Sequence, residues 1–420
     1  MTNSHSSKRC AGATAVALVV FFALFAAPFH AAAWLPEQAD VSRRTDTRFM
    51  RLPLSLENDL TYLLSLTSLD NDSLDLSEIQ DLLRFVASGR GNGAYFQPND
   101  RAGSEGTFCQ TDLNVSLNKI IAYNYSPDIP SYVAHPGSVR LSGWKPKNGL
   151  WKDLRKLSRP LPDEDSYVVV RGVEYQEITP DTNSGGYYRY DSRRVLIRGN
   201  DKSHPFVISI SRQIEPSGPG RKGVIIGDAD EWNYFYSGRE GLTVNGLGWA
   251  STYIYDSFFI AVYYQPDTKS PVTRHAVFSW LKGGWCSVNV VSADHIYEGT
   301  ERAMTTFKEV MESPRLPDPG IFADLVKQIR SYTDPELRNR LIPHLFELQK
   351  LSKNHPVLSR NDFSGIIREG KYLERMSREE LESMAVLEYF KRELGKKSHI
   401  TETALSSNTP SGQNPSRIRR

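Results

Sequence analysis

The stretch Thr273–Ser313 constrains the fold more than any other part of the chain. It predicts two antiparallel strands followed by a long helix, with Gly283-Gly284 between the strands. Two successive glycines tolerate the positive φ angles of a two-residue hairpin turn, so the turn is expected there. This register pairs Val277 with Val290 and gives each strand two distinct faces.

One predicted face is apolar and reads as core. It carries Val277, Leu281, Cys286, Val288 and Val290. The other face is aromatic with small polar groups, and it carries Phe278, Trp280, Trp285, Ser287 and Asn289. Such a face suits either the wall of a ligand site or a second packing layer.

The helix is expected to begin after Ser292, a favourable N-cap residue, and to end at Pro314. One mostly apolar stripe of residues recurs at spacings of three and four, which is the pattern of one buried helical face. They are Ile296, Thr300, Ala303, Phe307 and Val310.

Further strand patterns precede the hairpin, with turn residues and no helices between them. They lie at 166–178, 187–198, 205–212, 223–228, 232–237 and 251–265. Strands joined by short turns pair antiparallel, which excludes a βαβ sheet. The predicted fold class is therefore α+β, a curved antiparallel sheet packed against one long C-terminal helix, which resembles a helix-grip arrangement.

Helix-forming patterns flank this β-rich core on both sides. The predicted organisation is a helical N-terminal segment at 34–98, the core with its closing helix at 99–313, a helical segment at 314–395 and a disordered tail at 396–420.

Residues 1–33 predict a secretory signal. Two basic residues, Lys8 and Arg9, precede an apolar run, and Ala31–Ala33 supply a small-residue cleavage site. We expect a mature chain that starts at Trp34, is periplasmic or secreted, and has no stable membrane span; an uncleaved anchor is the alternative. Cleavage would remove two of the 51 basic residues, so the mature chain would have 49 basic and 49 acidic residues. A formal net charge of zero argues against a nucleic-acid-binding protein.

Two cysteines remain after such a cleavage, Cys109 and Cys286. In an oxidising compartment they have only each other as intramolecular partners, so a disulfide is predicted. Two buried free thiols are the alternative.

Acidic residues offer a few candidates for chemistry. Asp228 and Asp230 flank a strand at alternate positions, where two carboxylates can act as an acid/base pair or share a cation. A polar turn between two strands is the favoured explanation, because turns select Asp for local reasons. Asp256 interrupts an apolar strand face and is explained by a β-bulge or a rim position. The histidines show no metal-ligand spacing, so no metal, cofactor or catalytic site is predicted.

Aromatic residues with polar tips are concentrated in the β region, and such residues line pockets for apolar ligands. Plain sheet packing is the alternative, because Tyr and Trp favour strands. The candidate ligand-binding residues are Trp232, Tyr234, Trp249, Tyr253, Tyr255, Asp256, Phe278, Trp280 and Trp285.

Three functions remain open. An exported, non-enzymatic carrier of an apolar or lipid-like ligand predicts a cavity between sheet and helix. An envelope interaction or assembly protein acting through its C-terminal helices predicts a filled sheet–helix core. A hydrolase predicts that Asp228, Asp230 and Asp256 converge in one cleft.

Overall fold

The computed structural model describes residues 50–68, 74–163, 166–180, 185–244, 248–369 and 371–400. The predicted signal at 1–33 and the end of the predicted tail, 401–420, lie outside these residues. All described residues belong to one contact unit, Arg48–Arg420.

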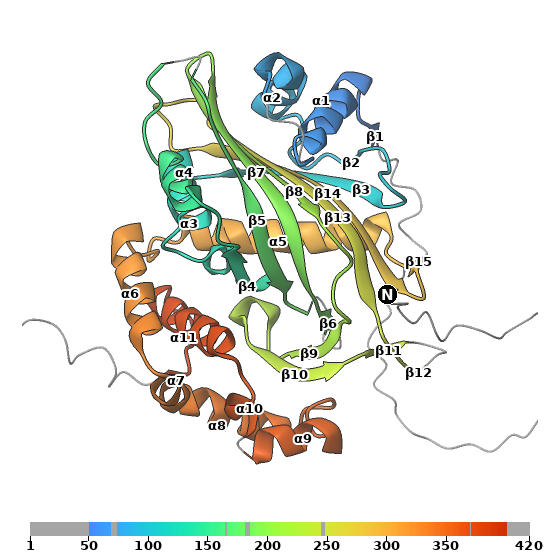
Figure 1. Ribbon diagram of the computed structural model, residues 1–420, viewed down its shortest axis with the longest axis vertical. Helices are drawn as coiled ribbons and strands as arrows, with labels where there is room; N and C mark the ends of the chain where they lie inside the picture. Colours follow the sequence, from blue (N-terminus) through green and yellow to red (C-terminus); the bar gives the residue numbers. More distant parts are fainter. Residues whose placement is uncertain are drawn as a thin grey trace, which may run out of the picture. The chain divides into compact units, whose positions relative to one another are not determined.

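The main sheet has eight strands, and every pairing in it is antiparallel, as predicted (Figure 1). The order is β15-β14-β13-β8-β7-β5-β4, and β3 pairs with β14. The strands are β3 (Glu105–Leu113), β4 (Val139–Trp144), β5 (Val168–Ile178), β7 (Arg189–Asp201), β8 (His204–Gln213), β13 (Tyr253–Tyr264), β14 (Thr273–Trp285) and β15 (Val288–Asn289).

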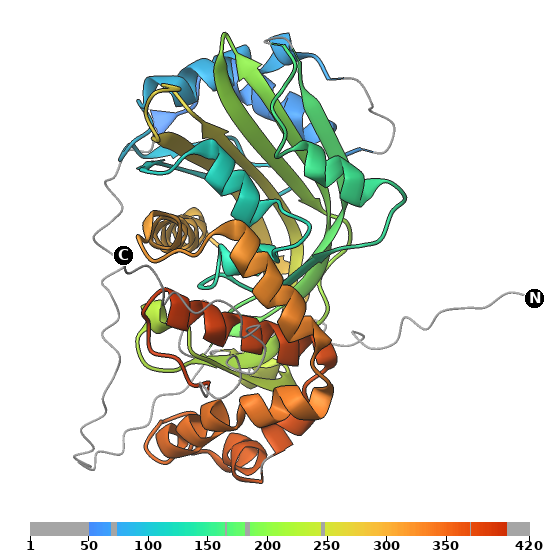
Figure 2. The same ribbon diagram turned by 90° about the vertical axis from the view of Figure 1, so that its left-hand side faces the viewer.

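Helices cover both faces of this sheet (Figures 1 and 2). Helices α1 (Leu54–Ser65) and α2 (Gln80–Ser88) share one hydrophobic cluster with alternate strand residues such as Ile197. Its neighbour Leu196 points the other way, into a cluster with α3 (Leu117–Asn124), α4 (Leu150–Lys156) and α5 (Ala293–Glu312). The α+β class is confirmed, but α5 shares its face with two further helices.

Helix α5 begins where the sequence predicts. The Ser292 hydroxyl accepts a hydrogen bond from the backbone N–H of His295, and the His295 ring accepts one from the Ser292 N–H. This reciprocal cap satisfies two N–H groups that otherwise have no helical partner. The inward face is fully buried at Phe307 and Met311, and each such side chain stabilises the fold by about 2 kcal/mol.

The predicted turn at Gly283-Gly284 is wrong. Strand β14 runs through both glycines to Trp285, and the chain reverses at Cys286 and Ser287, whose φ angles are 49° and 63°. Val277 therefore pairs with Ala261 and Cys109 and not with Val290. The glycines serve close approach instead, because a Cβ at Gly284 would lie 2.1 Å from the carbonyl oxygen of Val288.

The remaining strands form small sheets and pairs. They are β1 (Met50–Arg51) with β2 (Phe96–Gln97), β6 (Gly186–Tyr187) with β9 (Arg221–Ile225) and β10 (Tyr234–Glu240), and β11 (Leu242–Val244) with β12 (Gly248–Ala250). The predicted strands at 223–228 and 232–237 thus belong to a separate sheet. Short 3-10 turns lie at η2 (Leu76–Ile79), η3 (Ser131–Val133) and η4 (Ala229–Glu231).

A helical segment follows α5 and packs on the small sheet. It comprises α6 (Pro319–Ser331), α7 (Asp334–Arg340), α8 (Ile342–Ser352), α9 (Asn361–Arg368), α10 (Lys371–Glu374) and α11 (Arg378–Glu393). Its buried side chains belong to the same hydrophobic cluster as α5. None of the helices in the described ranges has both the length and the apolar character that crossing a bilayer requires.

Candidate functional site

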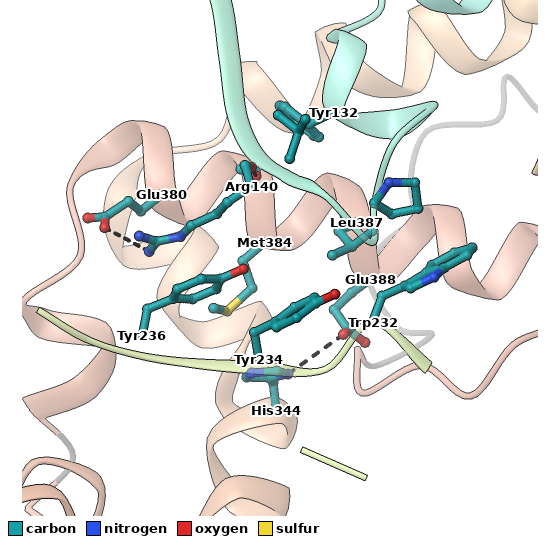
Figure 3. Close-up of a pocket in the computed structure, with 13 residues that line it drawn as sticks. Tyr132, Arg140, Trp232, Tyr234, Tyr236, His344, Glu380, Met384, Leu387 and Glu388 are labelled. Carbon is teal, nitrogen blue, oxygen red and sulfur yellow. Dashed lines mark hydrogen bonds and ion pairs between the residues drawn. The ribbon is translucent and has the colours of Figure 1, made fainter. Parts of the chain in front are cut away.

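A small pocket lies where α11 packs against β10 (Figure 3). Strand alternation presents Tyr234 and Tyr236 of β10 to it, and Trp232 stands just before that strand. Residues three or four apart on α11 supply the opposite wall. The lining residues are Tyr132, Pro136, Val139, Arg140, Trp232, Tyr234, Tyr236, His344, Glu380, Ser383, Met384, Leu387 and Glu388.

Arg140 of β4 is the buried cation at one end of this pocket. Its guanidinium donates to Glu177 at 2.6 Å and to Glu380 at 2.7 Å, and it lies 3.8 Å from the ring centroid of Tyr236. Burial alone would lower the pKa of Arg140, but the two carboxylates raise it. The same pairing lowers the pKa of Glu380, against the effect of its burial.

Glu388 of α11 is the buried anion at the other end. The Lys391 ammonium donates to it at 2.8 Å and to the Asn233 side-chain oxygen at 2.6 Å. The His344 ring lies 3.6 Å away, and the backbone N–H of His399 donates to the same carboxylate. Burial would raise the pKa of Glu388, but His344, Lys391 and this N–H hold it well below its usual range.

These contacts leave little scope for catalysis. A carboxylate with a strongly lowered pKa is a poor general base. The Ser383 hydroxyl donates to the carbonyl oxygen of Arg140 at 2.6 Å, so it is engaged by the backbone. The cavity volume is about 30 Å³, and such a space holds roughly one or two water molecules. We therefore assign this pocket a stabilising role, as a buried charge cluster joining α11 to the sheets.

The predicted ligand-binding residues are divided among separate places. Trp232 and Tyr234 line the pocket. Phe278 and Trp280 are fully buried in the cluster with α1 and α2, so their strand face is a second packing layer. The Trp280 indole donates to the carbonyl oxygen of Asn99 at 2.8 Å, which satisfies its one polar group.

The other predicted aromatic residues lie nearer the surface. The rings of Tyr253 and Tyr255 stack with centroids 6.2 Å apart, and the Tyr255 hydroxyl accepts from the backbone N–H of Ser287. Trp249 is exposed and donates to the carbonyl oxygen of Glu240. Trp285 ends β14 beside the turn.

The predicted carboxylates have local explanations. Asp228 and Asp230 are exposed at η4, in the turn between β9 and β10. Asp256 follows a bulge in β13, as predicted, and accepts from the backbone N–H of Ser257 at 3.0 Å. Burial raises the pKa of Asp256, while Arg212 and Lys282 lower it. In the part of the chain that the structure describes, no set of three His, Cys, Asp or Glu side chains forms a metal site.

The predicted disulfide is wrong, because both cysteines are free. Cys109 pairs with Val277 of β14 within the sheet. Cys286 lies nine residues after Val277, directly beyond the end of β14. At about 3.3 Å per strand residue this separates them by roughly 30 Å, far beyond the reach of a bridge. Cys109 is buried, which raises its pKa to about 12, and Cys286 is exposed.

A much larger groove, of about 590 Å³, lies on the C-terminal helices α8 and α9. Its lining residues are Phe346, Gln349, Lys350, Ser352, Lys353, Ser359, Ser364 and Arg368. The set includes three cations and no carboxylate. Phe346 is 63% exposed although it is a large apolar residue.

The sequence analysis missed this groove, but a signal for it existed. Phe346, Lys350 and Lys353 are spaced by four and three residues within the predicted helical segment 314–395, which is the spacing of one helical face. Arg368 on α9 completes the groove through tertiary packing, which sequence spacing does not reveal. The Arg368 guanidinium is held by Ser364, whose carbonyl and hydroxyl oxygens accept at 3.2 and 2.9 Å.

In comparisons with known proteins, no family model matches this chain, and no curated protein sequence matches it.

Proposed function

We propose that this protein is an exported, non-enzymatic interaction protein that binds its partner through the C-terminal helices α8 and α9. The observation that supports this most is the groove of about 590 Å³ beside the exposed ring of Phe346. This volume is within the range of known binding sites, and the lining places one exposed aromatic ring among polar and basic side chains. Export rests on the signal pattern at residues 1–33.

The carrier hypothesis has weaker support. It requires an apolar cavity between the sheet and α5, the site expected of a helix-grip protein. The side chains there pack against one another: the rings of His275 and Tyr263 stack at 4.4 Å, and Phe307 lies 5.3 Å from His275. All three are almost fully buried, so this region reads as packed core.

The hydrolase hypothesis also lacks a converging site. Asp228 and Asp230 are exposed in a turn of the small sheet, whereas Asp256 lies on the main sheet opposite Lys282. An acid/base pair needs both groups within reach of one substrate.

Site-specific photo-crosslinking tests the proposed function. A photoreactive phenylalanine analogue replaces Phe346 in the full chain, and a matched control carries it at Val288, which is 55% exposed on β15. We expect one reproducible crosslinked partner from position 346 in cells and none of that mass from position 288. Crosslinking in the Lys350→Glu/Lys353→Glu background should be reduced. Equal products at both positions, or no product at 346, would overturn the proposal.

A further inference from the structure

The chemistry of the α8–α9 groove narrows the class of partner, given the proposed function. Lys353, directly after α8, and Arg368, at the end of α9, are exposed, and neither forms an ion pair within the described ranges, although Glu369 interacts with Arg368 at longer range. Lys350 is 3.7 Å from Glu347, but its side chain is 76% exposed, and such surface pairs contribute little. The groove therefore presents net positive charge beside an apolar ring.

The spacing of these groups distinguishes an extended anion from a compact one. A helix rises 1.5 Å per residue, so Phe346 to Lys353 spans roughly 10 Å along α8. A single phosphate needs donors that converge within hydrogen-bond distance of one point, whereas these cations are spread along a helix and across to α9. In an extended peptide, side chains on one face recur at about 7 Å. Carboxylates on one face of such a peptide are therefore spaced similarly to the cations along α8 and across to α9.

The apolar ring adds a second requirement. Phe346 stands one helical turn before Lys350, on the same face. A ligand that buries this ring while contacting the cations must carry an apolar side chain next to its acidic ones. Acidic motifs with an apolar anchor are a recurring way in which a peptide is recognised.

From this geometry we infer that the groove binds an acidic peptide segment of a partner protein, one that places an aromatic or aliphatic side chain on Phe346 and carboxylates on Lys350, Lys353 and Arg368. Charge complementarity then sets the rate of association and its dependence on salt.

Fluorescence anisotropy on the full chain tests this inference. The probe is a short fluorescein-labelled peptide in which glutamate alternates with phenylalanine and glycine, compared with a copy carrying glutamine in place of glutamate. We expect the acidic peptide to bind and the glutamine copy to bind at least about tenfold more weakly. Binding should weaken as salt is raised, because salt screens exposed charges.

Matched variants locate the binding. Lys350→Glu/Lys353→Glu should weaken binding of the acidic peptide at least about tenfold. Lys152→Glu/Lys269→Glu makes the same change of net charge at exposed lysines outside the groove, and it should leave affinity unchanged. Arg368→Gln tests α9 separately, with circular dichroism as the check on folding.

Several outcomes would overturn the inference. Equal binding of the glutamine copy would make the groove an apolar site. Unchanged affinity in Lys350→Glu/Lys353→Glu would put the binding elsewhere, and displacement by millimolar inorganic phosphate alone would indicate a phosphate site. Absence of peptide binding together with a specific crosslink at position 346 would refute the acidic partner and leave the proposed function standing.

Discussion

Two histidines in the core beneath α5 are unusual residues for such a place. The His135 ring stacks on Phe307 with centroids 4.8 Å apart, and its Nε2 lies 3.0 Å from the Asn124 side-chain oxygen. His275 stacks on Tyr263, and neither of its ring nitrogens has a hydrogen-bond partner in the described parts of the chain. Burial lowers the pKa of His135 to about 4 and that of His275 to about 3, with Arg194 and His135 as the respective secondary causes.

These shifts predict loss of stability in acid. An unfolded histidine takes up a proton below its ordinary pKa of 6.5, whereas the folded ones stay neutral until much lower pH. The stability that depends on keeping these histidines neutral is fully present above pH 6.5. It is lost as the pH falls toward the pKa values of the folded state. Each histidine should lower the free energy of unfolding by about 3 kcal/mol between neutral pH and roughly pH 4.

The variant His275→Phe tests this effect. Phenylalanine keeps the stacked ring and removes the titrating nitrogens, so the free energy of unfolding should fall by about 3 kcal/mol less than in the native chain between pH 7 and about pH 4. Urea unfolding at a series of pH values measures it. His204→Phe, at a partly exposed position on β8, is the control and should retain the native pH dependence. A native-like dependence in His275→Phe would contradict the prediction.

Helix α11 is the element that joins the C-terminal segment to the sheets. Its fully buried Lys391 reaches Glu388 and Asn233, Ser398 donates to the same carboxylate, and Ile400 is buried. Residues 396–400 thus lie against α11, although the sequence predicts a disordered tail from Lys396. Composition alone did not reveal that these residues supply partners to a buried charge.

Lys391→Met should lower the free energy of unfolding by about 3 kcal/mol, because it leaves the Glu388 carboxylate buried with fewer partners. The double variant Lys391→Met/Glu388→Gln should recover at least about 1 kcal/mol of this loss, since it removes the uncompensated charge as well. Urea unfolding at neutral pH, followed by tryptophan fluorescence, measures both.

Lys371→Met is the control at the element scale. Lys371 pairs with Glu369 at an exposed site, so its loss should change stability by less than about 0.5 kcal/mol. If Lys391→Met has no larger effect than this control, Glu388 does not depend on Lys391.

Local pattern predicted some elements well and others poorly. The long strands and α5 follow from periodicity and a good cap. The alternation in 116–125 predicts a strand, yet Ser116 caps α3 by accepting from the Lys119 N–H. The turn at Cys286 and Ser287 lacks the Gly, Asn or Asp that usually adopt positive φ. Its position follows from the register in which β14 pairs with β13 and β3. Tertiary pairing overrides local preference at such positions.

At the scale of the whole molecule, the sequence could not tell that both sheet faces are covered. The aromatic face of β14 suits a ligand wall or a packing layer equally, and only the position of α1 and α2 decides between them. The site prediction failed for the same reason: the sequence predicts strands at both Trp232 and Phe278, but Trp232 precedes β10 and the two residues lie in different hydrophobic clusters. The spacing of Lys350 and Lys353 indicates a basic helical face, but the approach of Arg368 of α9 to that face depends on tertiary packing and cannot be predicted from spacing.

Filled sheet faces predict the behaviour of the purified protein. Native mass spectrometry of exported protein should give the mass of a chain starting at Trp34, without a co-purified lipid. The expected reason is that side chains occupy the space a lipid tail would need. The same protein isolated with its uncleaved N-terminus serves as the control for adventitious binding to the apolar run. A stoichiometric lipid adduct on the cleaved chain would instead support the carrier hypothesis.

The pairing of β3 with β14 has a consequence for biogenesis. Phe108 and Phe278 lie 4.7 Å apart in the finished sheet, yet some 170 residues separate them along the chain. A nascent polypeptide cannot close this edge until β14 has been made, because contacts of long sequence separation form late. Until then the hydrophobic cluster under α1 and α2 lacks the β14 side chains that complete it, such as Phe278 and Trp280. We expect partly synthesised chains to need a chaperone that binds unfolded segments. The late pairing of β3 with β14 would keep the chain unfolded for longer, in a state that can pass through an export channel.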